Sequence, residues 1–308
     1  MLNYTVDVVD STELNQGFEY LEVVGPDAAG ESVLDYLARK HSRFGREEWA
    51  ARIESHRVLL DAEPASAETT LRPMQKLVWL RPPWREPDAP LCFAVLYRDE
   101  HLLAVAKPPG LPTVPGGGFL EHTLLRLVRR SYVEASPTHR LGRGTSGIVL
   151  FARTSEAARK VSEAWRRGEV LKIYRALASG LIARDEFRIE VPIGPVPHAV
   201  LGRVYAATPD GKRSLSQIRV LKRDHGNSIV QVKITTGRTH QIRIHLAAAG
   251  HPLAGDRFYA AGGVPAEGTK ALPGDAGYCL HAEQLSLVHP ETGHWLEITC
   301  AAPPPLRT

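Results

Sequence analysis

The sequence has little of three features that define whole classes of protein. Its 308 residues include three cysteines, Cys92, Cys279 and Cys300, too few and too scattered for a disulfide framework or for paired Cys-x-x-Cys metal ligands. No apolar run approaches the roughly 18 residues of a membrane-spanning helix. The first 38 residues contain no Lys or Arg and eight acids, whereas targeting peptides begin with positive charge. We expect a cytoplasmic protein with reduced thiols.

Positive charge is confined to the rest of the chain. The net charge is only +4, but residues 39–308 hold all 38 Lys and Arg and 26 of the 34 acids, so this part carries +12 against −8 in the first 38 residues. A cationic body favours a polyanionic partner, and nucleic acid is the leading candidate. The length exceeds the usual 100 to 200 residues or so of one domain, which predicts a catalytic-size domain plus a smaller module.

The N-terminal part predicts a basic helical hairpin. Residues 31–40 and 45–54 carry apolar side chains at helical spacing, and short strands are expected at 58–60 and 77–80. Basic residues crowd the helices, and a face of this density can contact a phosphate backbone. A solvated helix face is the alternative interpretation. The candidate RNA contacts on this face are Arg39, Lys40, Arg43, Arg46 and Arg57.

A proline-rich segment separates this module from the rest of the chain. Residues 82–90 are too rich in proline for a helix or a central strand and predict a stiff linker. From Cys92 onward, apolar runs of strand length alternate with turns, and helices are expected at 155–167 and 239–249. Strands predominate, so residues 91–308 predict an α+β domain on a mixed or antiparallel sheet. Residues 262–277 predict a surface loop.

Two segments place basic residues at turns. His139, Arg140 and Arg143 stand among the glycines of THRLGRGTSG (138–147), where the backbone can approach a ligand and guanidinium forks can bind phosphate or base edges. A basic surface turn is the alternative. Arg238 and His240 stand where a strand meets a helix, and the free amides of a first helical turn favour an anion there.

Metal and hydrolase chemistry do not fit these spacings. His240, His245 and His251 are five and six residues apart, which does not place two imidazoles on one helical face, so no metal is expected. Residues 144–147 lack the spacing of a GxSxG nucleophile elbow. Tyr174 stands in a predicted strand between basic neighbours, where it either packs in the sheet or stacks beneath a nucleobase.

The ordered motifs resemble the RluA family of RNA pseudouridine synthases over about residues 91–302. Five segments carry the resemblance: LYRDEHLLAVAKPPGLPTVPG, HRLGRGTSGIVLFAR, KIYRALASG, TGRTHQIRIHLAAAGHPLAGDRFYA and LHAEQLSLVHPETG. Residues 29–81 resemble the small RNA-binding module of ribosomal-protein S-four type, although Asp61-Ala62 stands where an Asn-Gly turn is expected and His56 where a Gly is expected. Residues 1–28 are then an acidic N-terminal extension.

The resemblance implies a cofactor-free isomerisation of uridine in RNA, with ribosomal or transfer RNA as the partner. The uridine is flipped into a pocket, its glycosidic bond is broken, the uracil rotates, and carbon 5 is rejoined to the ribose. By resemblance, Arg140 fills the space left by the flipped base and Tyr174 stacks on the uracil. Arg243 pairs with the family's aspartate, and Leu280 lines the pocket.

The position of that aspartate is Gly142, which has no side chain to attack or to accept a proton. One hypothesis is a synthase with a displaced acid, for which Asp256 and Asp99 are the candidates by motif, although both match positions of structural turns. The other is a catalytically silent RNA-binding protein that uses the same cleft. In either case Arg243 is expected to lack its anionic partner, which leaves a more positive pocket.

Overall fold

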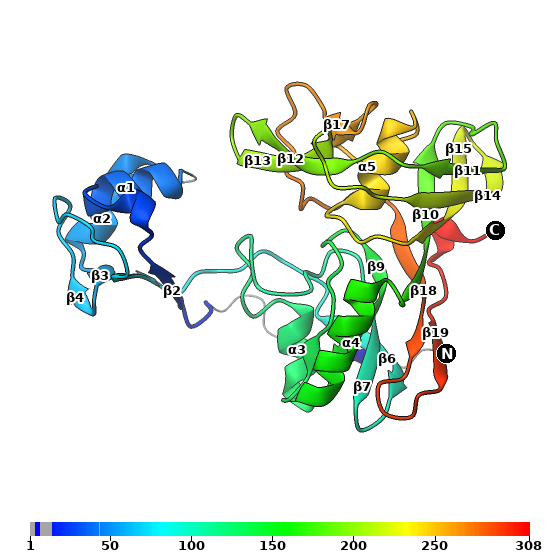
Figure 1. Ribbon diagram of the computed structural model, residues 1–308, viewed down its shortest axis with the longest axis horizontal. Coiled ribbons are helices and arrows are strands. Elements are labelled where there is room, and N and C mark those ends of the chain that lie inside the picture. The colour runs from blue at the N-terminus through cyan, green and yellow to red at the C-terminus, as the bar shows by residue number, and fades with distance from the viewer. Residues whose placement is uncertain (1–3, 7–13, 43) are drawn as a thin grey trace. The chain divides into compact units, whose positions relative to one another are not determined.

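The computed structural model describes residues 4–6, 14–42 and 44–308, and it divides the chain into two compact units (Figure 1). The smaller unit contains residues 11–86 together with 199–201, and the larger one contains the remainder. The main boundary follows Glu86, inside the proline-rich segment. None of the helices among the described residues is long and apolar enough to cross a membrane.

The smaller unit packs a helical hairpin on a four-stranded sheet. Helices α1 (Val33–Lys40) and α2 (Arg46–Glu54) confirm the two predicted helices. The strand order is β2-β5-β3-β4, with bounds β2 (Phe18–Val23), β3 (Val58–Leu60), β4 (Glu63–Pro64) and β5 (Lys76–Arg81). A 3-10 turn, η1 (Pro26–Ala28), precedes α1. Apolar side chains of both helices and the sheet form one buried core, including Tyr36, Trp49 and Leu77.

The expectation of a separate acidic extension over residues 1–28 is wrong. β2 pairs antiparallel with β5 from Phe18 opposite Arg81 to Val23 opposite Lys76, and β1 (Tyr4–Val6) pairs with β6 (Cys92–Arg98) in the larger unit. Charge counting concealed these strands because the acids of the segment alternate with apolar and aromatic residues that belong in a sheet.

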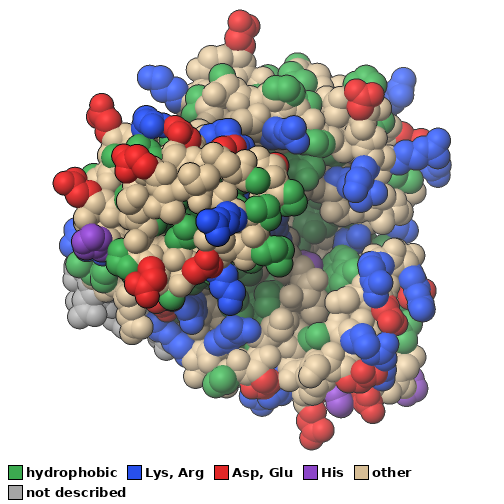
Figure 2. All heavy atoms as spheres, turned by 60° about the vertical axis from the view of Figure 1, so that its left-hand side comes forward, with side chains coloured by type: hydrophobic (Ala, Val, Ile, Leu, Met, Phe, Trp, Pro, Cys, Tyr) green, Lys and Arg blue, Asp and Glu red, His purple; other side chains and the backbone are tan. Residues whose placement is uncertain are grey.

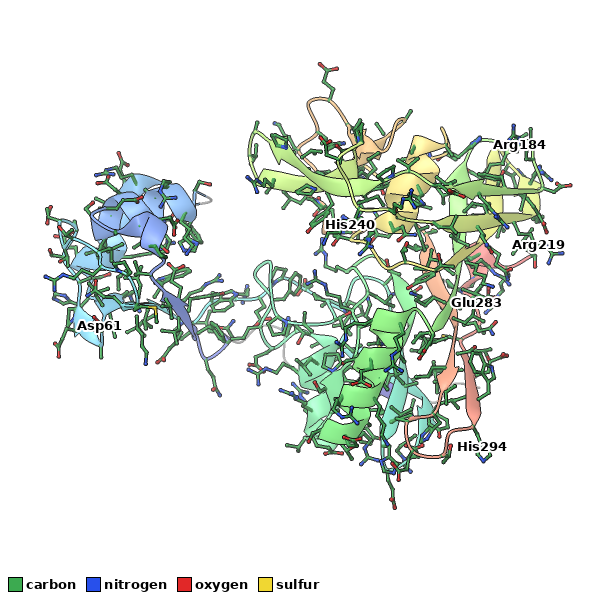
Figure 3. All side chains as sticks on the ribbon, in the orientation of Figure 1. Asp61, Arg184, Arg219, His240, Glu283 and His294 are labelled. Atoms are coloured by element: carbon green, nitrogen blue, oxygen red, sulfur yellow. The ribbon has the colours of Figure 1, made fainter. Side chains whose placement is uncertain are left out.

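The turn between β3 and β4 explains one departure from the S-four pattern. Asp61 and Ala62 both adopt left-handed backbone conformations, with φ of 51° and 74°, which Asn-Gly would adopt with less strain. The Asp61 carboxylate accepts hydrogen bonds from the Lys76 N–H and the Gln75 side chain, at 2.8 and 2.9 Å (Asp61 is labelled in Figure 3). These bonds stabilise the tight turn without a glycine.

The larger unit is built on one mixed sheet of eleven strands, which confirms the α+β class. Its main path is β1-β6-β7-β9-β18-β10-β15-β14-β11, with β19 added beside β18 and β8 beside β9. Only the β9–β18 pair is parallel among these described strands. The bounds are β7 (Leu102–Lys107), β8 (Ser136–Pro137), β9 (Ser146–Ala152), β10 (Leu171–Ser179), β11 (Glu186–Ile189), β14 (Ser216–Asp224), β15 (Asn227–Ile234), β18 (Leu280–Val288) and β19 (Trp295–Thr299).

Helices cover both faces of the sheet. Along β7, Leu102, Ala104 and Ala106 pack in the cluster of α4 (Ser155–Arg167), while the alternate residues pack in the cluster of α3 (Leu124–Ser131). Because successive strand residues point to opposite faces, α3 and α4 lie on opposite sides. α5 (Gln241–Ala248) covers β10, β14 and β15. Short pairs complete the unit: β12 (Ile193–His198) with β13 (Gly202–Ala207), and β16 (Tyr259–Ala260) with β17 (Val264–Pro265); η2 (Pro304–Leu306) is near the C-terminus.

Candidate active site

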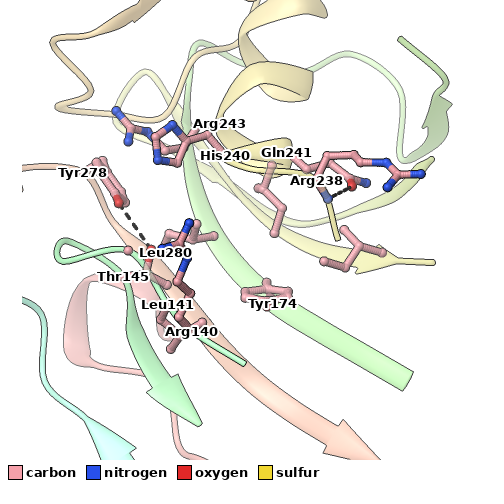
Figure 4. A pocket seen from close by; sticks show the side chains of 13 residues that line it. Arg140, Leu141, Thr145, Tyr174, Arg238, His240, Gln241, Arg243, Tyr278 and Leu280 are labelled. Carbon is pink, nitrogen blue, oxygen red and sulfur yellow. Dashed lines mark hydrogen bonds between the residues drawn. The ribbon is translucent and has the colours of Figure 1, made fainter. Parts of the chain in front are cut away.

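A pocket opens where the loop before β9, strands β10 and β18, and the start of α5 come together (Figure 4). We call it the inner pocket; its volume is about 120 Å³. It brings together residues that are up to 140 positions apart in the sequence, from Arg140 to Leu280. The lining consists of Arg140, Leu141, Gly142, Thr145, Tyr174, Ile234, Arg238, His240, Gln241, Ile242, Arg243, Tyr278 and Leu280.

Most of the site residues predicted from the sequence line this pocket. All of those named from the resemblance are present: Arg140, Gly142, Tyr174, Arg243 and Leu280. Arg238 and His240, predicted from the strand-to-helix junction, line it as well. Burial raises the pKa of Tyr174 to about 12, so its phenol remains protonated at neutral pH. The pocket therefore presents an aromatic ring with a neutral hydroxyl beside several cations.

The space beside Gly142 is occupied by Tyr278. A Cβ atom placed on Gly142 would lie 3.0 Å from the Tyr278 hydroxyl and 3.6 Å from Thr145 Oγ1, and these two hydroxyls are themselves 3.3 Å apart. A Cβ on Gly144 would lie 2.9 Å from the Tyr278 ring. The two glycines of the loop thus provide room for this tyrosine. Its hydroxyl and that of Thr145 are the polar groups nearest the position of the family's carboxylate.

Arg243 has an anionic partner, contrary to the expectation that it would lose one. Its Nε and Nη2 donate to the two carboxylate oxygens of Asp256 at 2.6 and 2.9 Å, and both side chains are buried. The guanidinium also lies 4.4 Å from the Tyr278 ring centroid and 4.8 Å from that of Tyr259. A bidentate pair of this kind satisfies the cation, so the pocket is less positive than predicted.

Asp256 is therefore not available as a displaced acid. Besides Arg243, its Oδ1 accepts from the N–H groups of Phe258 and Tyr259, which fixes the turn that follows the helix. Burial by itself would raise the pKa of Asp256, but the Arg243 guanidinium and these amides outweigh burial and lower it. A carboxylate so fully engaged is a weak base and a weak nucleophile.

Asp99 is engaged in another part of the unit. Its carboxylate accepts from the N–H groups of His101 and Leu102, and it also contacts Tyr97 Oη and His289 Nε2. It does not line the inner pocket. Like Asp256, it caps a turn, as the motif comparison indicated. Among the described residues the inner pocket is lined by no carboxylate.

His240 supplies an uncharged imidazole. It precedes α5 in a left-handed conformation, with φ of 55°, and is labelled in Figure 3. Its Nδ1 lies 2.9 Å from Tyr259 Oη, which donates its own proton to the Tyr205 carbonyl, so Nδ1 is the donor to Tyr259. Burial and the Arg243 cation lower the pKa of His240 to about 4, so Nε2 is an acceptor at neutral pH.

Two predicted RNA contacts have other partners. His139 Nε2 accepts from the Leu150 N–H at 3.0 Å, and burial together with the Lys172 ammonium lowers its pKa to about 4. A neutral, engaged imidazole fixes the loop to β9. Arg143 donates to the Gly274 carbonyl at 3.1 Å and does not line the inner pocket. Its predicted contact with RNA is not supported by this arrangement.

A larger groove adjoins the inner pocket, and it shares Arg140, Tyr174, Ile234 and Arg238 with it. We call it the outer groove; its volume is about 690 Å³. Arg166, Arg167 and Lys172 add further positive charge, and no acid lines it among the described residues. The Lys172 ammonium is buried and lies 5.0 Å from the Trp165 ring centroid. The groove is suited to a phosphate backbone.

A buried lysine supports the loop that carries Gly142. Lys107 Nζ donates to the carbonyls of Pro108, Leu111 and Arg143 at 2.9, 2.6 and 3.3 Å. Burial lowers its pKa to about 7. Because its acceptors come from the loop after β7 and from the loop before β9, Lys107 links the two loops.

The basic helices of the smaller unit are largely neutralised by acids of the first 38 residues. Arg39 pairs with Glu31 at 2.8 Å, Lys40 with Glu22 at 2.7 Å, and Arg46 with Asp35. Figure 2 shows basic and acidic side chains interspersed over one face of the molecule. Arg57 is exposed, and the predicted contact Arg43 lies outside the described residues. The split into an acidic start and a basic body therefore does not survive folding.

Several residues of the site could not be selected from the sequence. Tyr278 follows the glycine-rich segment 262–277 and reaches Gly142 only through the fold. Gln241 accepts from Thr236 Oγ1 and the Arg238 N–H, and its amide donates to the Leu215 carbonyl, so it fixes the start of α5. The one available signal was Thr145, which belongs to the quoted motif.

The comparisons with known proteins agree with this geometry. A family described as RNA pseudouridylate synthase matches residues 101–248. An uncharacterized RNA pseudouridine synthase of Synechocystis sp. is 40% identical over 90% of this chain and 96% of its own. The dual-specificity RNA pseudouridine synthase RluA of Yersinia pestis is 36% identical over 68% of this chain and 98% of its own.

A solved structure agrees with the fold as well. The human RNA pseudouridylate synthase domain containing 1 is 26% identical, covers 72% of this chain and 89% of its own, and superposes with a TM-score of 0.57. Relatives that cover nearly the whole chain, a similar fold and a shared pocket point to one conclusion. The chain belongs to the RluA family of RNA pseudouridine synthases.

Proposed function

We propose that the protein binds RNA, takes a flipped uridine into the inner pocket and isomerises it to pseudouridine. The observation that carries the proposal is the convergence of Arg140, Tyr174, Arg243 and Leu280 on one pocket from four separate segments. Ribosomal and transfer RNA are the substrates to test first.

The two adjoining cavities match the two parts of a flipped nucleotide. The inner pocket presents the Tyr174 ring and the Leu280 side chain, which suit the flat faces of a uracil. The outer groove presents Arg166, Arg167 and Lys172 without an acid among the described residues, which suits the flanking phosphates. Arg140 and Arg238 line both cavities and lie where the ribose would pass from one to the other.

The reaction needs no co-reactant because uridine and pseudouridine are isomers. The bond between uracil N1 and ribose C1′ breaks, the base turns, a bond forms between C5 and C1′, and the proton lost from C5 is balanced by one gained at N1. In this chain the hydroxyls of Tyr278 and Thr145 face the position that a carboxylate occupies in the family. We propose that these hydroxyls and the neutral His240 imidazole carry the proton transfers.

The second candidate is a catalytically silent RNA-binding protein that uses the same cleft. A specific observation favours it: no carboxylate lines the inner pocket among the described residues, and both candidate acids are engaged elsewhere. Under this proposal the protein recognises or remodels RNA without changing its covalent structure.

Pseudouridine mapping separates the two candidates. The purified full-length chain is incubated with ribosomal and transfer RNA from a strain that lacks the corresponding gene, and pseudouridine is located by selective chemical labelling. New pseudouridine that disappears with Tyr174→Ala supports the synthase. RNA that is bound through the cleft, is released by Tyr174→Ala and acquires no pseudouridine supports the silent protein instead.

A further inference from the structure

We propose that the smaller unit contains a second RNA site, a slot that takes an unpaired nucleobase. The slot lies between α2, β5 and the proline-rich segment and has a volume of about 450 Å³, within the roughly 300–1,000 Å³ of small-ligand pockets. Its principal residues are Phe44, Arg52, Arg57, Trp79, Arg81 and Trp84, and we call it the aromatic slot. That the ligand is RNA rests on the proposed function.

Guanidinium planes and aromatic rings alternate through the slot. The Arg52 guanidinium carbon lies 4.0 Å from the Phe44 ring centroid and 4.6 Å from that of Trp79. The Arg81 guanidinium carbon lies 3.5 Å from the ring centroid of Trp84. Splayed-out RNA bases are held by the same two kinds of surface, aromatic rings and Arg planes. A flat, electron-rich ring with a polar edge is the ligand that these surfaces match.

The charge around the slot favours a polyanion. Three arginines line it, and its one acid, Glu48, already pairs with Arg52. Within the described part of the chain, neither Arg57 nor Arg81 forms a salt bridge. This contrasts with Arg39, Lys40 and Arg46 on the helices, whose charges are paired. The cations available to phosphate therefore lie at the slot rather than on the basic helix face.

Two buried donors in the slot lack acceptors. Arg52 Nη1 and Trp79 Nε1 are buried and make no hydrogen bond among the described residues. Burial of the Arg52 guanidinium, together with repulsion from Arg81, lowers its pKa. Folded proteins satisfy most buried polar groups, and exceptions concentrate at sites with a function. The carbonyl oxygens of a nucleobase edge are acceptors of the required kind.

The test uses the full-length chain and a fluorescein-labelled single-stranded RNA of about ten nucleotides that carries one 4-thiouridine. Binding is measured by fluorescence anisotropy, and the ultraviolet crosslink is located by mass spectrometry. We expect a crosslink on the peptide that contains Trp79 and Trp84. Trp84→Ala should weaken binding about tenfold, while Trp84→Phe should retain it, because stacking of one base contributes about 1–3 kcal/mol.

Matched variants separate the slot from general charge. Arg81→Lys keeps the charge but loses the plane, so it should weaken binding more than Arg39→Ala, which removes a paired cation on α1. Equal thermal unfolding midpoints exclude misfolding as the cause. Wild-type affinity in Trp84→Ala without a slot crosslink would overturn the proposal, and so would preferred binding of a proline-rich peptide by the slot.

The outcome is independent of the pseudouridine assay. A slot crosslink in a protein that forms no pseudouridine leaves the slot established and removes the proposed isomerisation. Pseudouridine formation together with unchanged RNA binding by Trp84→Ala does the reverse.

Discussion

The hydroxyl of Tyr278 lies 3.0 Å from the point where a side chain on Gly142 would begin. The backbone of Gly142 does not adopt a positive φ, so the position tolerates other residues in conformation but not in space. Tyrosine and glycine are thus a complementary pair, and this pair stands where the family has an aspartate.

This pair predicts that an aspartate at position 142 needs a smaller neighbour. Gly142→Asp alone should place its Cβ against the Tyr278 hydroxyl and lower the midpoint of thermal unfolding, because crowding in a packed site costs about 1–3 kcal/mol. Gly142→Asp combined with Tyr278→Phe should recover most of this loss. Pseudouridine formation is measured for wild type, both variants and Gly142→Ala. If wild type is already as active as the double variant, the silent interpretation is wrong.

The buried pair of Arg243 and Asp256 predicts a large loss of stability when one partner is removed. Asp256→Asn should lower the free energy of unfolding by about 3–5 kcal/mol, because it leaves the guanidinium buried without its anion. Urea unfolding followed by circular dichroism measures the change. Asp275→Asn, which removes the exposed partner of Arg143, serves as the control and should cost less than about 1 kcal/mol. Equal losses in the two variants would contradict the assignment.

Lys107 predicts an unusual dependence of stability on pH. Burial lowers its pKa from 10.5 to about 7 in the folded chain, so between these values the unfolded chain binds more protons than the folded one. The free energy of unfolding should therefore rise as the pH increases from about 7 towards 10. Lys107→Met should remove this rise while keeping the side chain apolar and of similar length. The comparison is made by urea unfolding at several pH values, and an identical slope in wild type and variant would count against it.

The outer groove predicts a salt-sensitive contact with RNA. Arg238→Gln should weaken binding of single-stranded RNA and reduce the slope of log K against log salt by about 0.7, the value for one phosphate contact on a single strand. Arg219→Gln, exposed on β14 and paired with Glu186, is the matched control and should leave the slope unchanged. Anisotropy titrations at several salt concentrations measure both. A slope unaffected by Arg238→Gln would show that no phosphate binds there.

Local patterns determined most of the secondary structure. The helices over 155–167 and around 239–249, and the strands that begin near Cys92, follow from periodicity, because the side chains that repeat on one face are those that the core buries. The order of the motifs was sufficient to identify the family. Residues 18–23 escaped because acids dominate their composition, although their alternation is that of an edge strand.

Only the tertiary structure decided which charges are paired. In the sequence, Arg243 was expected to lose its anion, and Asp256 was a candidate acid; thirteen positions apart, they form one buried ion pair. Acids of the first 38 residues likewise neutralise the helices that composition marked as basic. Glycine at position 142 is visible in the sequence, but its counterpart Tyr278 is not. Such pairings depend on distances between segments remote in the chain, and no local pattern encodes those distances.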